Sequence, residues 1–523
     1  MTAARVRLGA VALGALAMAV AAGASSAEPT LGAKQGPRPN IILVVTDDQT
    51  LAAFNGHTMP YTIGSVAGQG TTFANAIAVT PLCCPSRASM ITGQYGHNNG
   101  VVNNKPGYPA LRDKPNVLPA WLRAAGYYTA HVGRYLNEYP HGRNTKPAPG
   151  WDEWVSALEP RRYFGYELQV GRDSVEFGKK ASDYITTVLN NRATQIISKQ
   201  APKPQPFYLQ LDQFAPHAGP GMPKGPCAGR DVPDALPADY AQFATEPLPT
   251  PPSFNEEDIS DKPSFVRKVP LLTEKRIAAI TQRYRCALGS LPAVDRGMAA
   301  IDAALAQAGE LDNTVVMFVS DNGFYYGEHR LPREKIRPYE EGLRIPLAIR
   351  VPAGVLGAPV VSSVDELVAN IDLTPTILDF AGALPCIAPD HCRVMDGRSL
   401  VPLLRGEDGW PPDRGLAIEF RTADEKFNTS SSCEYHGIRT PGQLYVQHVS
   451  VPNAVDGTCE PADEREHYDL AADPFELQNL YPADPESLTG FVEGLLAERS
   501  ARLANCAGIE GRDPAPASGN YCE

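Results

Sequence analysis

The sequence predicts an α/β fold with a large, mostly parallel or mixed sheet flanked by helices, and a smaller C-terminal antiparallel α+β subdomain. Three apolar, β-branched runs predict strands buried on both faces: NIILVVTDDQ (40–49), PFYLQLDQF (206–214) and TVVMFVSDNG (314–323). Helical patterns lie between them, at VLPAWLRAAGYY (117–128) and in the long segment 276–309. Strands that alternate with helices favour a sheet covered by helices on both faces.

At the N-terminus, residues 1–27 have the pattern of a secretory signal peptide. Arg5 and Arg7 precede an apolar, alanine-rich stretch, and Ser25-Ser26-Ala27 offers small residues for cleavage. A membrane anchor is the weaker alternative, because the stretch is short and only weakly hydrophobic for a span of about 20 residues. We therefore expect an exported chain, secreted or periplasmic, with residues 28–38 as a linker and no stable membrane insertion after cleavage.

The pattern of predicted helices and strands divides the rest of the chain into segments. Residues 39–400 carry the α/β pattern and are predicted to form the main domain. The proline-rich stretch 202–263 is too long for a plain connection, so we interpret it as an insertion that overlies the site. Residues 401–505 show short strands and turns followed by a helical pattern near 485–503, which predicts the antiparallel subdomain, and 506–523 form a tail.

The overall charge and the cysteines narrow the function further. A net charge of −12 argues against a nucleic acid partner, because phosphate binding requires clustered Lys and Arg. Export permits disulfides among the ten cysteines. Close spacing suggests the pairs Cys386–Cys392, Cys506–Cys522 and Cys433–Cys459, and Cys227–Cys286 is the remaining pair. Five disulfides that use every cysteine are the alternative, although adjacent cysteines pair poorly with each other.

Acidic side chains follow two of the predicted strands. Asp47 and Asp48 end the first strand, and Asp321 and Asn322 end the last. In α/β sheets, sites form at the carboxyl ends of the strands. Carboxylate and amide oxygens favour Ca²⁺ or Mg²⁺ over Zn²⁺, and we expect one Ca²⁺ in an exported protein. SDNG alone is more typical of a turn; the two pairs together favour a metal site.

The stretch CCPSRASMITG (83–93) sets two cysteines before a short helical pattern. Pro85 and Ser86 are expected to begin that helix, which places Cys83 beside a helix N-terminus that favours anions. Arg87 adds a fork-shaped cation able to grip a tetrahedral oxyanion. A thiolate is a poor ligand for a hard cation, so the arrangement makes more sense if Cys83 becomes an oxygen-bearing group.

This stretch resembles the sulfatase signature Cys-x-Pro-Ser-Arg with its Thr-Gly ending. In that family the first cysteine is oxidised to Cα-formylglycine by a formylglycine-generating enzyme, which would act on Cys83 during maturation and leave Cys84 as the unconstrained position. The resemblance implies an alkaline-phosphatase-like fold with 39–400 as the catalytic domain. It also implies Asp47, Asp48, Asp321 and Asn322 as Ca²⁺ ligands, together with the modified Cys83.

Other segments resemble the same family from about Pro39 to Leu480. QFAPHAGP resembles the segment that contributes a site histidine, His217, and SDNGFYYGEHRLPREKIRPYEEGLRIPLAIR resembles the segment with a site lysine, Lys335. GQYGHNNGVVNN and GRYLNEY are most similar to N-acetylglucosamine-6-sulfatases and related extracellular sulfatases. Where many sulfatases have Gly-Lys-x-His, this chain has Gly133-Arg134-Tyr135-Leu136. Arg134 keeps the charge for sulfate binding, but it is a poor proton donor.

The resemblance implies hydrolysis of sulfate monoesters, of the aryl or 6-sulfated N-acetylglucosamine type, by attack of the formylglycine hydrate at sulfur with release of sulfate. The partner would be a sulfated small molecule or glycan. Arg87, Arg134 and Lys335 would share the charge on the sulfuryl oxygens, and His217 or Lys335 would protonate the leaving oxygen. The alternatives are a phosphomonoester or phosphonate hydrolase of the same superfamily and an inactive carbohydrate-binding relative.

A few other polar residues have no role that the sequence patterns above assign to them. His97 is as consistent with a turn as with the site, and Asn103 and Asn104 are candidates for substrate contact. His57 is expected to have no role in the site. Asn428 begins an Asn-x-Ser/Thr glycosylation motif, which matters only in a secretory route that glycosylates.

Overall fold

The protein is described by a computed structural model that covers residues 38–140, 145–159, 161–220, 224–229, 231–422, 433–453 and 458–481. Several sequence-based predictions lie outside these residues. They are the signal peptide, nearly all of the linker, the helix near 485–503, the tail, the Cys506–Cys522 pair and Asn428. Among the described residues, no helix is both long and apolar enough to span a membrane.

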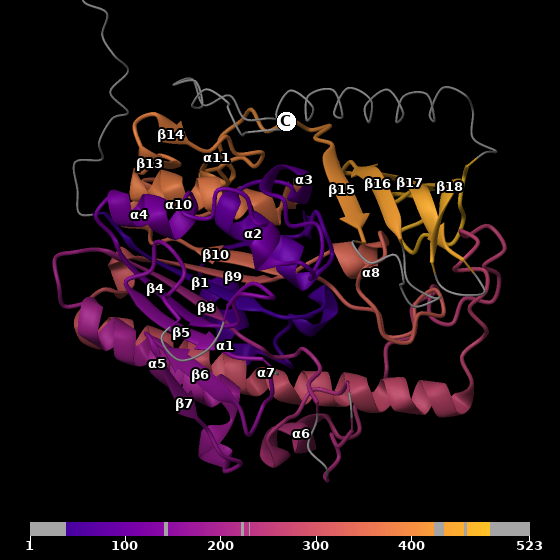
Figure 1. Ribbon diagram of the computed structural model, residues 1–523, viewed down its shortest axis with the longest axis horizontal. Helices are drawn as coiled ribbons and strands as arrows, with labels where there is room; N and C mark the ends of the chain where they lie inside the picture. Colours follow the sequence, from indigo (N-terminus) through magenta and orange to yellow (C-terminus); the bar gives the residue numbers. More distant parts are fainter. Residues whose placement is uncertain are drawn as a thin grey trace, which may run out of the picture. The chain divides into compact units, whose positions relative to one another are not determined.

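A ten-stranded mixed sheet forms the centre of the chain and confirms the predicted α/β fold (Figure 1). In spatial order its strands are β11 (Ser363–Val364), β2 (Thr71–Phe73), β10 (Leu347–Arg350), β9 (Thr314–Ser320), β1 (Asn40–Thr46), β8 (Phe207–Asp212), β4 (Tyr128–Gly133), β5 (Glu153–Ala157), β6 (Glu167–Val170) and β7 (Asp173–Glu176). The five central strands, from β9 to β5, are all parallel to their neighbours in this group. Their carboxyl ends therefore lie at one edge of the sheet.

Helices cover both faces of this sheet, as the alternation of strands and helices predicts (Figure 1). α2 (Cys83–Thr92), α4 (Leu118–Ala124) and α10 (Leu373–Ala381) lie on one face, and α5 (Ile185–Gln200) and α7 (Glu274–Ala308) on the other. Successive side chains of β1 alternate between the two apolar clusters, so the strand is buried on both sides. This double burial explains why its sequence is continuously apolar rather than alternating.

Shorter elements complete this part of the chain. α6 (Pro237–Phe243) packs against α7, and two small sheets pair β3 (Ala76–Ile77) with β12 (Val368–Ala369) and β13 (Cys386–Ala388) with β14 (His391–Cys392). The remaining short helices are α1 (Pro60–Thr62), α3 (Gly96–Asn99), α8 (Glu340–Leu343), α9 (Ala353–Leu356) and α11 (Val401–Leu404).

The C-terminal part forms a separate four-stranded antiparallel sheet, as predicted. Its strands are β15 (Leu416–Arg421), β16 (Glu434–Arg439), β17 (Gln443–Pro452) and β18 (Cys459–Asp469). The sheet lies beside α8 in Figure 1, and Arg439 on β16 forms an ion pair with Glu340 of α8 at 2.8 Å. The C-terminal sheet is therefore tied directly to the segment that follows β9.

The structure corrects two sequence-based predictions and shows which of the described cysteines are disulfide-bonded. The stretch 202–263 is not one insertion, because it contains β8, a central strand of the sheet. α2 begins at Cys83 rather than at Pro85. The pairs Cys227–Cys286, Cys386–Cys392 and Cys433–Cys459 are disulfide-bonded, while Cys83 and Cys84 are free, so the alternative in which every cysteine is paired is wrong.

Candidate active site

The carboxyl ends of four neighbouring parallel strands supply most of the predicted site. Asp47 and Asp48 follow β1, and Asp321 and Asn322 follow β9. β8 ends at Asp212 and leads into the loop that carries His217, and Arg134 follows β4. These strands are adjacent in the order β9-β1-β8-β4, so their ends meet without any long loop to bring them together.

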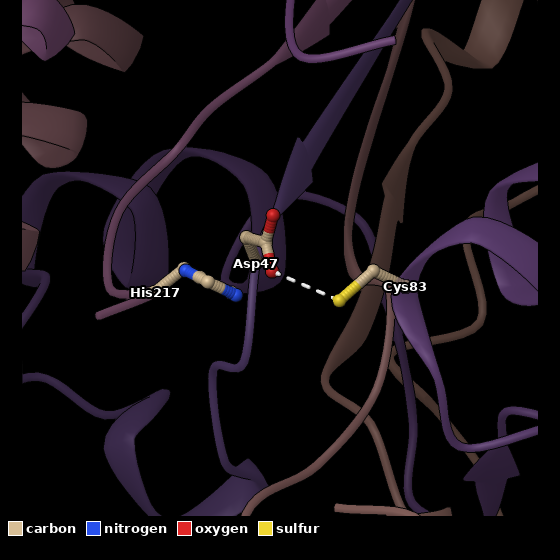
Figure 2. A group of neighbouring side chains, drawn as sticks. All are labelled: Asp47, Cys83 and His217. Carbon is tan, nitrogen blue, oxygen red and sulfur yellow. Dashed lines mark hydrogen bonds between the residues drawn. The ribbon is translucent and has the colours of Figure 1, made fainter. Parts of the chain in front are cut away.

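Cys83 is the first residue of α2 and faces this edge of the sheet. Its side chain is fully buried, and its Sγ lies 3.6 Å from Asp47 Oδ1 (Figure 2) and accepts a hydrogen bond of 2.8 Å from Lys335 Nζ. Burial raises the pKa of the Cys83 thiol to about 12. A thiol that stays protonated at neutral pH is a weak nucleophile, so the unmodified sulfur is poorly suited to attack an ester.

Three buried carboxylates lie together beside Cys83. Asp47, Asp48 and Asp321 each offer an oxygen, and these oxygens lie within 4.8 Å of one another. Burial, and next the neighbouring Asp47, raise the pKa of Asp321 to about 7. Three acidic groups this close repel one another unless a positive charge lies among them.

Asn322 supplies the observation that tests whether a cation fits here. Its Nδ2 donates to Asp48 Oδ1 at 2.7 Å, whereas its buried Oδ1 has no hydrogen-bond partner among the described residues. A buried amide oxygen without a partner is costly, and the donors near it are directed at the carboxylates instead. A hard divalent cation satisfies both the free amide oxygen and the carboxylates. The residues present therefore fit a divalent metal.

Arg87 contacts carboxylates in three directions. Its Nε donates to Asp321 and its Nη1 to Asp212, both at 2.8 Å, and its Nη2 lies 3.4 Å from Asp47. The guanidinium is almost fully buried. In this arrangement Arg87 fixes the positions of carboxylates at three strand ends, so its donors point at the protein rather than outward to an oxyanion.

Asp212 is a member of the site that the sequence analysis did not name. Besides accepting from Arg87, its Oδ2 lies 3.0 Å from His131 Nε2, and its backbone oxygen accepts from the Arg134 amide at 2.9 Å. The signal was present, because LQLD ends an apolar run in the same way as VVTDD and FVSDN. The sequence therefore contains three acidic strand ends of the same kind.

Replacing Arg87 with glutamine is expected to lower the free energy of unfolding of the metal-free protein by about 3–5 kcal/mol, because buried carboxylates lose their shared counter-ion. Urea unfolding followed by circular dichroism measures this. Arg123→Gln is the matched control, since Arg123 is 58% exposed and pairs with Asp152 at the surface; its loss should cost less than about 1 kcal/mol. Equal effects of the two substitutions would contradict the role of Arg87.

Lys335, His217 and Arg134 surround the same carboxylates. Lys335 Nζ lies 2.5 Å from Asp48 Oδ1 and bridges it to Cys83. His217 lies on the other side of Asp47 from Cys83 (Figure 2), with its Nε2 3.8 Å from Asp48 Oδ2. Burial lowers the pKa of His217 to about 4. Arg134 Nη1 contacts Asp47 Oδ2. The structure thus brings together every residue that the sequence analysis assigned to the site.

Burial alone would raise the pKa of Asp47, but Arg134, His217, Arg87 and Lys335 together hold it well below its usual range. The Asp47 carboxylate is therefore charged at any working pH. A group that stays ionised in this way is suited to hold a cation or to orient a positive side chain.

The other polar residues considered from the sequence contact parts of the protein outside the carboxylate cluster. His97 Nδ1 lies 2.7 Å from Glu419 on β15, which links α3 to the C-terminal sheet. Asn104 accepts from the Cys84 amide at 3.1 Å near the start of α2, and Asn103 donates to the Arg421 carbonyl. His57 is exposed and pairs with Glu246 at 3.4 Å, outside the site.

The fold, with its site at the strand ends, is of the alkaline-phosphatase-like class. The chain belongs to the sulfatase family, because the sequence model of Sulfatase matches residues 39–383 and that of N-sulphoglucosamine sulphohydrolase, C-terminal matches residues 327–495. It is accordingly a sulfuric ester hydrolase. Members of this family generally use formylglycine and a divalent metal, and the strand-end carboxylates are a candidate site for such a metal.

Curated relatives agree with this assignment. The chain is 30% identical to the N-acetylglucosamine-6-sulfatase of Homo sapiens, over 91% of this chain and 86% of that protein. It is 29% identical to an arylsulfatase of Volvox carteri, over 88% and 74% of the two chains. An extracellular sulfatase SULF-1 homolog of Drosophila melanogaster is 32% identical over 72% of this chain and 32% of its own length.

Solved structures share the fold. One, described as a complex with its substrate D-glucosamine-2-N,6-O-disulfate, has a TM-score of 0.71 and 24% identity, and covers 91% of this chain and 100% of that one. The phosphonate monoester hydrolase of Agrobacterium radiobacter has a TM-score of 0.61 and 21% identity, and covers 89% and 96%. The fold alone therefore does not separate sulfate from phosphonate chemistry.

Proposed function

We propose that the chain hydrolyses 6-sulfated N-acetylglucosamine or a closely related sulfate monoester, with Cys83 converted to formylglycine and one Ca²⁺ held at the strand ends. The observation that carries the proposal is the place of Cys83. It begins α2 in contact with Asp47 and Lys335, beside three carboxylates and an amide oxygen without a partner. A nucleophile is needed at this point, and an unmodified thiol is a poor one.

Ca²⁺ would be held by Asp47, Asp48, Asp321 and Asn322, together with an oxygen on residue 83, and would polarise the groups bound to it. Formylglycine would supply a hydrated aldehyde whose oxygen attacks sulfur. Arg87 would keep Asp47, Asp212 and Asp321 in place. Arg134 and Lys335 are the cations best placed to share charge on the sulfuryl oxygens.

The proton for the leaving oxygen is assigned to Lys335 or His217. Lys335 reaches both Cys83 and Asp48, so it lies next to the attacking position. His217 lies on the far side of Asp47, where its ring nitrogen Nδ1 contacts the Ala218 carbonyl at 2.5 Å and leaves Nε2 toward Asp48. Because the Ala218 carbonyl can only accept, Nδ1 carries the ring proton and donates it to that contact. Nε2 is then the ring atom that would take up a proton and pass it on.

The sugar assignment rests on the curated relatives, among which N-acetylglucosamine-6-sulfatases match most of the chain. Arylsulfatases match nearly as well, so an aryl sulfate is the second candidate. We also propose the boundaries 39–400 for the catalytic domain and 401–505 for the C-terminal subdomain. Export through the signal peptide 1–27 and maturation by a formylglycine-generating enzyme complete the proposal.

A comparison of matched esters tests the function. We expect p-nitrophenyl sulfate to be hydrolysed faster than p-nitrophenyl phosphate, because a single cation with Arg134 and Lys335 suits a monoanionic sulfate ester better than a dianionic phosphate. N-acetylglucosamine 6-sulfate should exceed the aryl sulfate in kcat/KM. Faster turnover of the phosphate ester would overturn the sulfate assignment. Faster turnover of the aryl ester alone would overturn the sugar assignment.

A further inference from the structure

A second cluster of metal-ligating side chains lies apart from the residues of the active site. It consists of His329, in the segment between β9 and α8; Glu341, in α8; and Glu476, which follows β18. One ligand atom from each lies within 4.8 Å of the other two. His329 and Glu476 are fully buried, and the Glu341 side chain is 20% exposed.

Each of these side chains uses one polar atom and leaves the other without a partner. His329 Nδ1 pairs with Glu256 Oε2 at 2.8 Å, and Glu341 Oε1 accepts from Ser253 Oγ at 2.9 Å. Glu476 Oε2 accepts from the Glu340 amide at 2.8 Å. The remaining atoms are buried and have no hydrogen-bond partner among the described residues: His329 Nε2, Glu341 Oε2 and Glu476 Oε1.

Direct hydrogen bonding within the cluster does not account for these three atoms. His329 Nε2 lies 3.7 Å from Glu341 Oε2, beyond the usual range for an N–H···O bond. Two carboxylate oxygens that face each other cannot donate to one another when ionised. Buried polar atoms are nearly always satisfied, so three such atoms without a partner, on side chains that approach one another this closely, favour a bound ligand between them.

The negative charges of the glutamates in the cluster also lack a full complement of positive partners. Glu256 is paired with Lys262, whose Nζ lies 3.3 Å from Glu256 Oε1. Among the described contacts, Glu341 faces a cation only if His329 is protonated. A neutral His329, which is the form that binds a metal, would leave Glu341 and Glu476 as two buried negative charges together. Burying unpaired charge in this way is expensive.

We propose that His329 Nε2, Glu341 Oε2 and Glu476 Oε1 bind a divalent transition-metal ion such as Zn²⁺ or Mn²⁺. One imidazole nitrogen and two carboxylate oxygens form a ligand set for these ions rather than for Ca²⁺, which takes oxygen ligands. The contact from His329 Nδ1 to Glu256 matches the carboxylate partner that metal-binding histidines generally have on their second nitrogen. The ion would carry the charge that the two glutamates lack.

Such an ion would join three parts of the chain that are far apart in sequence. Glu476 belongs to the segment after the C-terminal sheet, Glu341 to α8, and His329 to the loop that continues to Lys335. The ion would therefore hold the C-terminal segment against the loop that carries a lysine of the active site. This role is structural and does not depend on which ester the enzyme hydrolyses.

Metal content tests the site. The full-length protein is stripped with a chelator, reloaded with Zn²⁺ or Mn²⁺, freed of unbound metal by gel filtration and measured by elemental mass spectrometry. We expect Glu476→Gln to hold one equivalent less than the wild type. Glu366→Gln is the matched control, because Glu366 is an exposed carboxylate, and it should hold as much metal as the wild type. Equal metal in the wild type and Glu476→Gln overturns the proposal, and the cluster then holds an imidazolium.

A second variant keeps the test valid if Glu476→Gln does not fold. Glu256→Gln leaves all three ligands in place and weakens the support of His329, as well as the ion pair with Lys262, so its affinity for Zn²⁺ should fall by about 10–100-fold. Competition with a chromophoric chelator measures the affinity. Unchanged affinity in Glu256→Gln would count against His329 as a ligand. Sulfatase activity does not enter either readout, so a wrong functional assignment leaves this test intact.

Discussion

Replacing Cys83 with alanine is expected to lower kcat for sulfate ester hydrolysis by about 10⁴–10⁶-fold, in the range seen when a catalytic nucleophile is removed. The reason is positional: Cys83 is the residue at the start of α2 that contacts both Asp47 and Lys335, and the proposed function takes the attacking atom from it. Steady-state assays with p-nitrophenyl sulfate measure the loss.

Cys84 provides a matched control for this substitution. It is the adjacent residue, equally buried and also free, but within the described part of the chain its Sγ accepts only from the Asn137 amide, at 3.3 Å. Cys84→Ala keeps the Cys-x-Pro-Ser-Arg signature intact and should retain activity within about tenfold. If Cys83→Ala kept the activity of the wild type, or if Cys84→Ala lost as much, the assignment of residue 83 as the source of the nucleophile would be wrong.

Removal of the divalent metal should reduce kcat/KM by about 10²–10³-fold, because a bound cation supplies several kcal/mol of charge stabilisation in such reactions. The Asp47, Asp48 and Asp321 carboxylates, together with Asn322, would lose the ion that balances them. Activity is measured after chelation and again after Ca²⁺ or Mg²⁺ is added back. We expect Ca²⁺ to restore it.

A substitution of Asn322 distinguishes loss of the metal at this site from other effects of the chelator on activity. In Asn322→Leu the free amide oxygen is removed while the three carboxylates remain, so a higher concentration of Ca²⁺ should be needed for half-maximal activity. Asn313→Leu is the control, since Asn313 is a partly buried asparagine whose side chain donates to Glu310, away from the site. Full activity of the chelated wild type would show that no metal is required.

The strands and the site were predictable from the sequence for the same reason. A strand buried on both faces has to be apolar throughout, so β1, β8 and β9 stand out, and any polar residue at the end of such a run is conspicuous. Because parallel strands end at one edge, Asp47, Asp48, Asp321 and Asn322 could be brought together without a structure. His217, Lys335 and Arg134 lie in loops and depended on the family resemblance instead.

Partners of side chains could not be predicted. Arg87 was expected to point toward an oxyanion, but which acceptor a guanidinium chooses depends on distances that only the packed chain defines. Asp212 was missed because a single carboxylate at a strand end is less conspicuous than a pair. The cluster of His329, Glu341 and Glu476 joins a loop, α8 and the segment after β18, and no local pattern in the sequence connects them.

The burial of Cys83 has a consequence for the order of events in biosynthesis. None of its surface is accessible once α2 has packed against the sheet. An enzyme that oxidises this side chain must therefore reach it while the polypeptide is still unfolded or incompletely folded. A chain that folds before it meets that enzyme would keep its thiol. Under the proposed function, the yield of active protein would then depend on whether oxidation precedes folding.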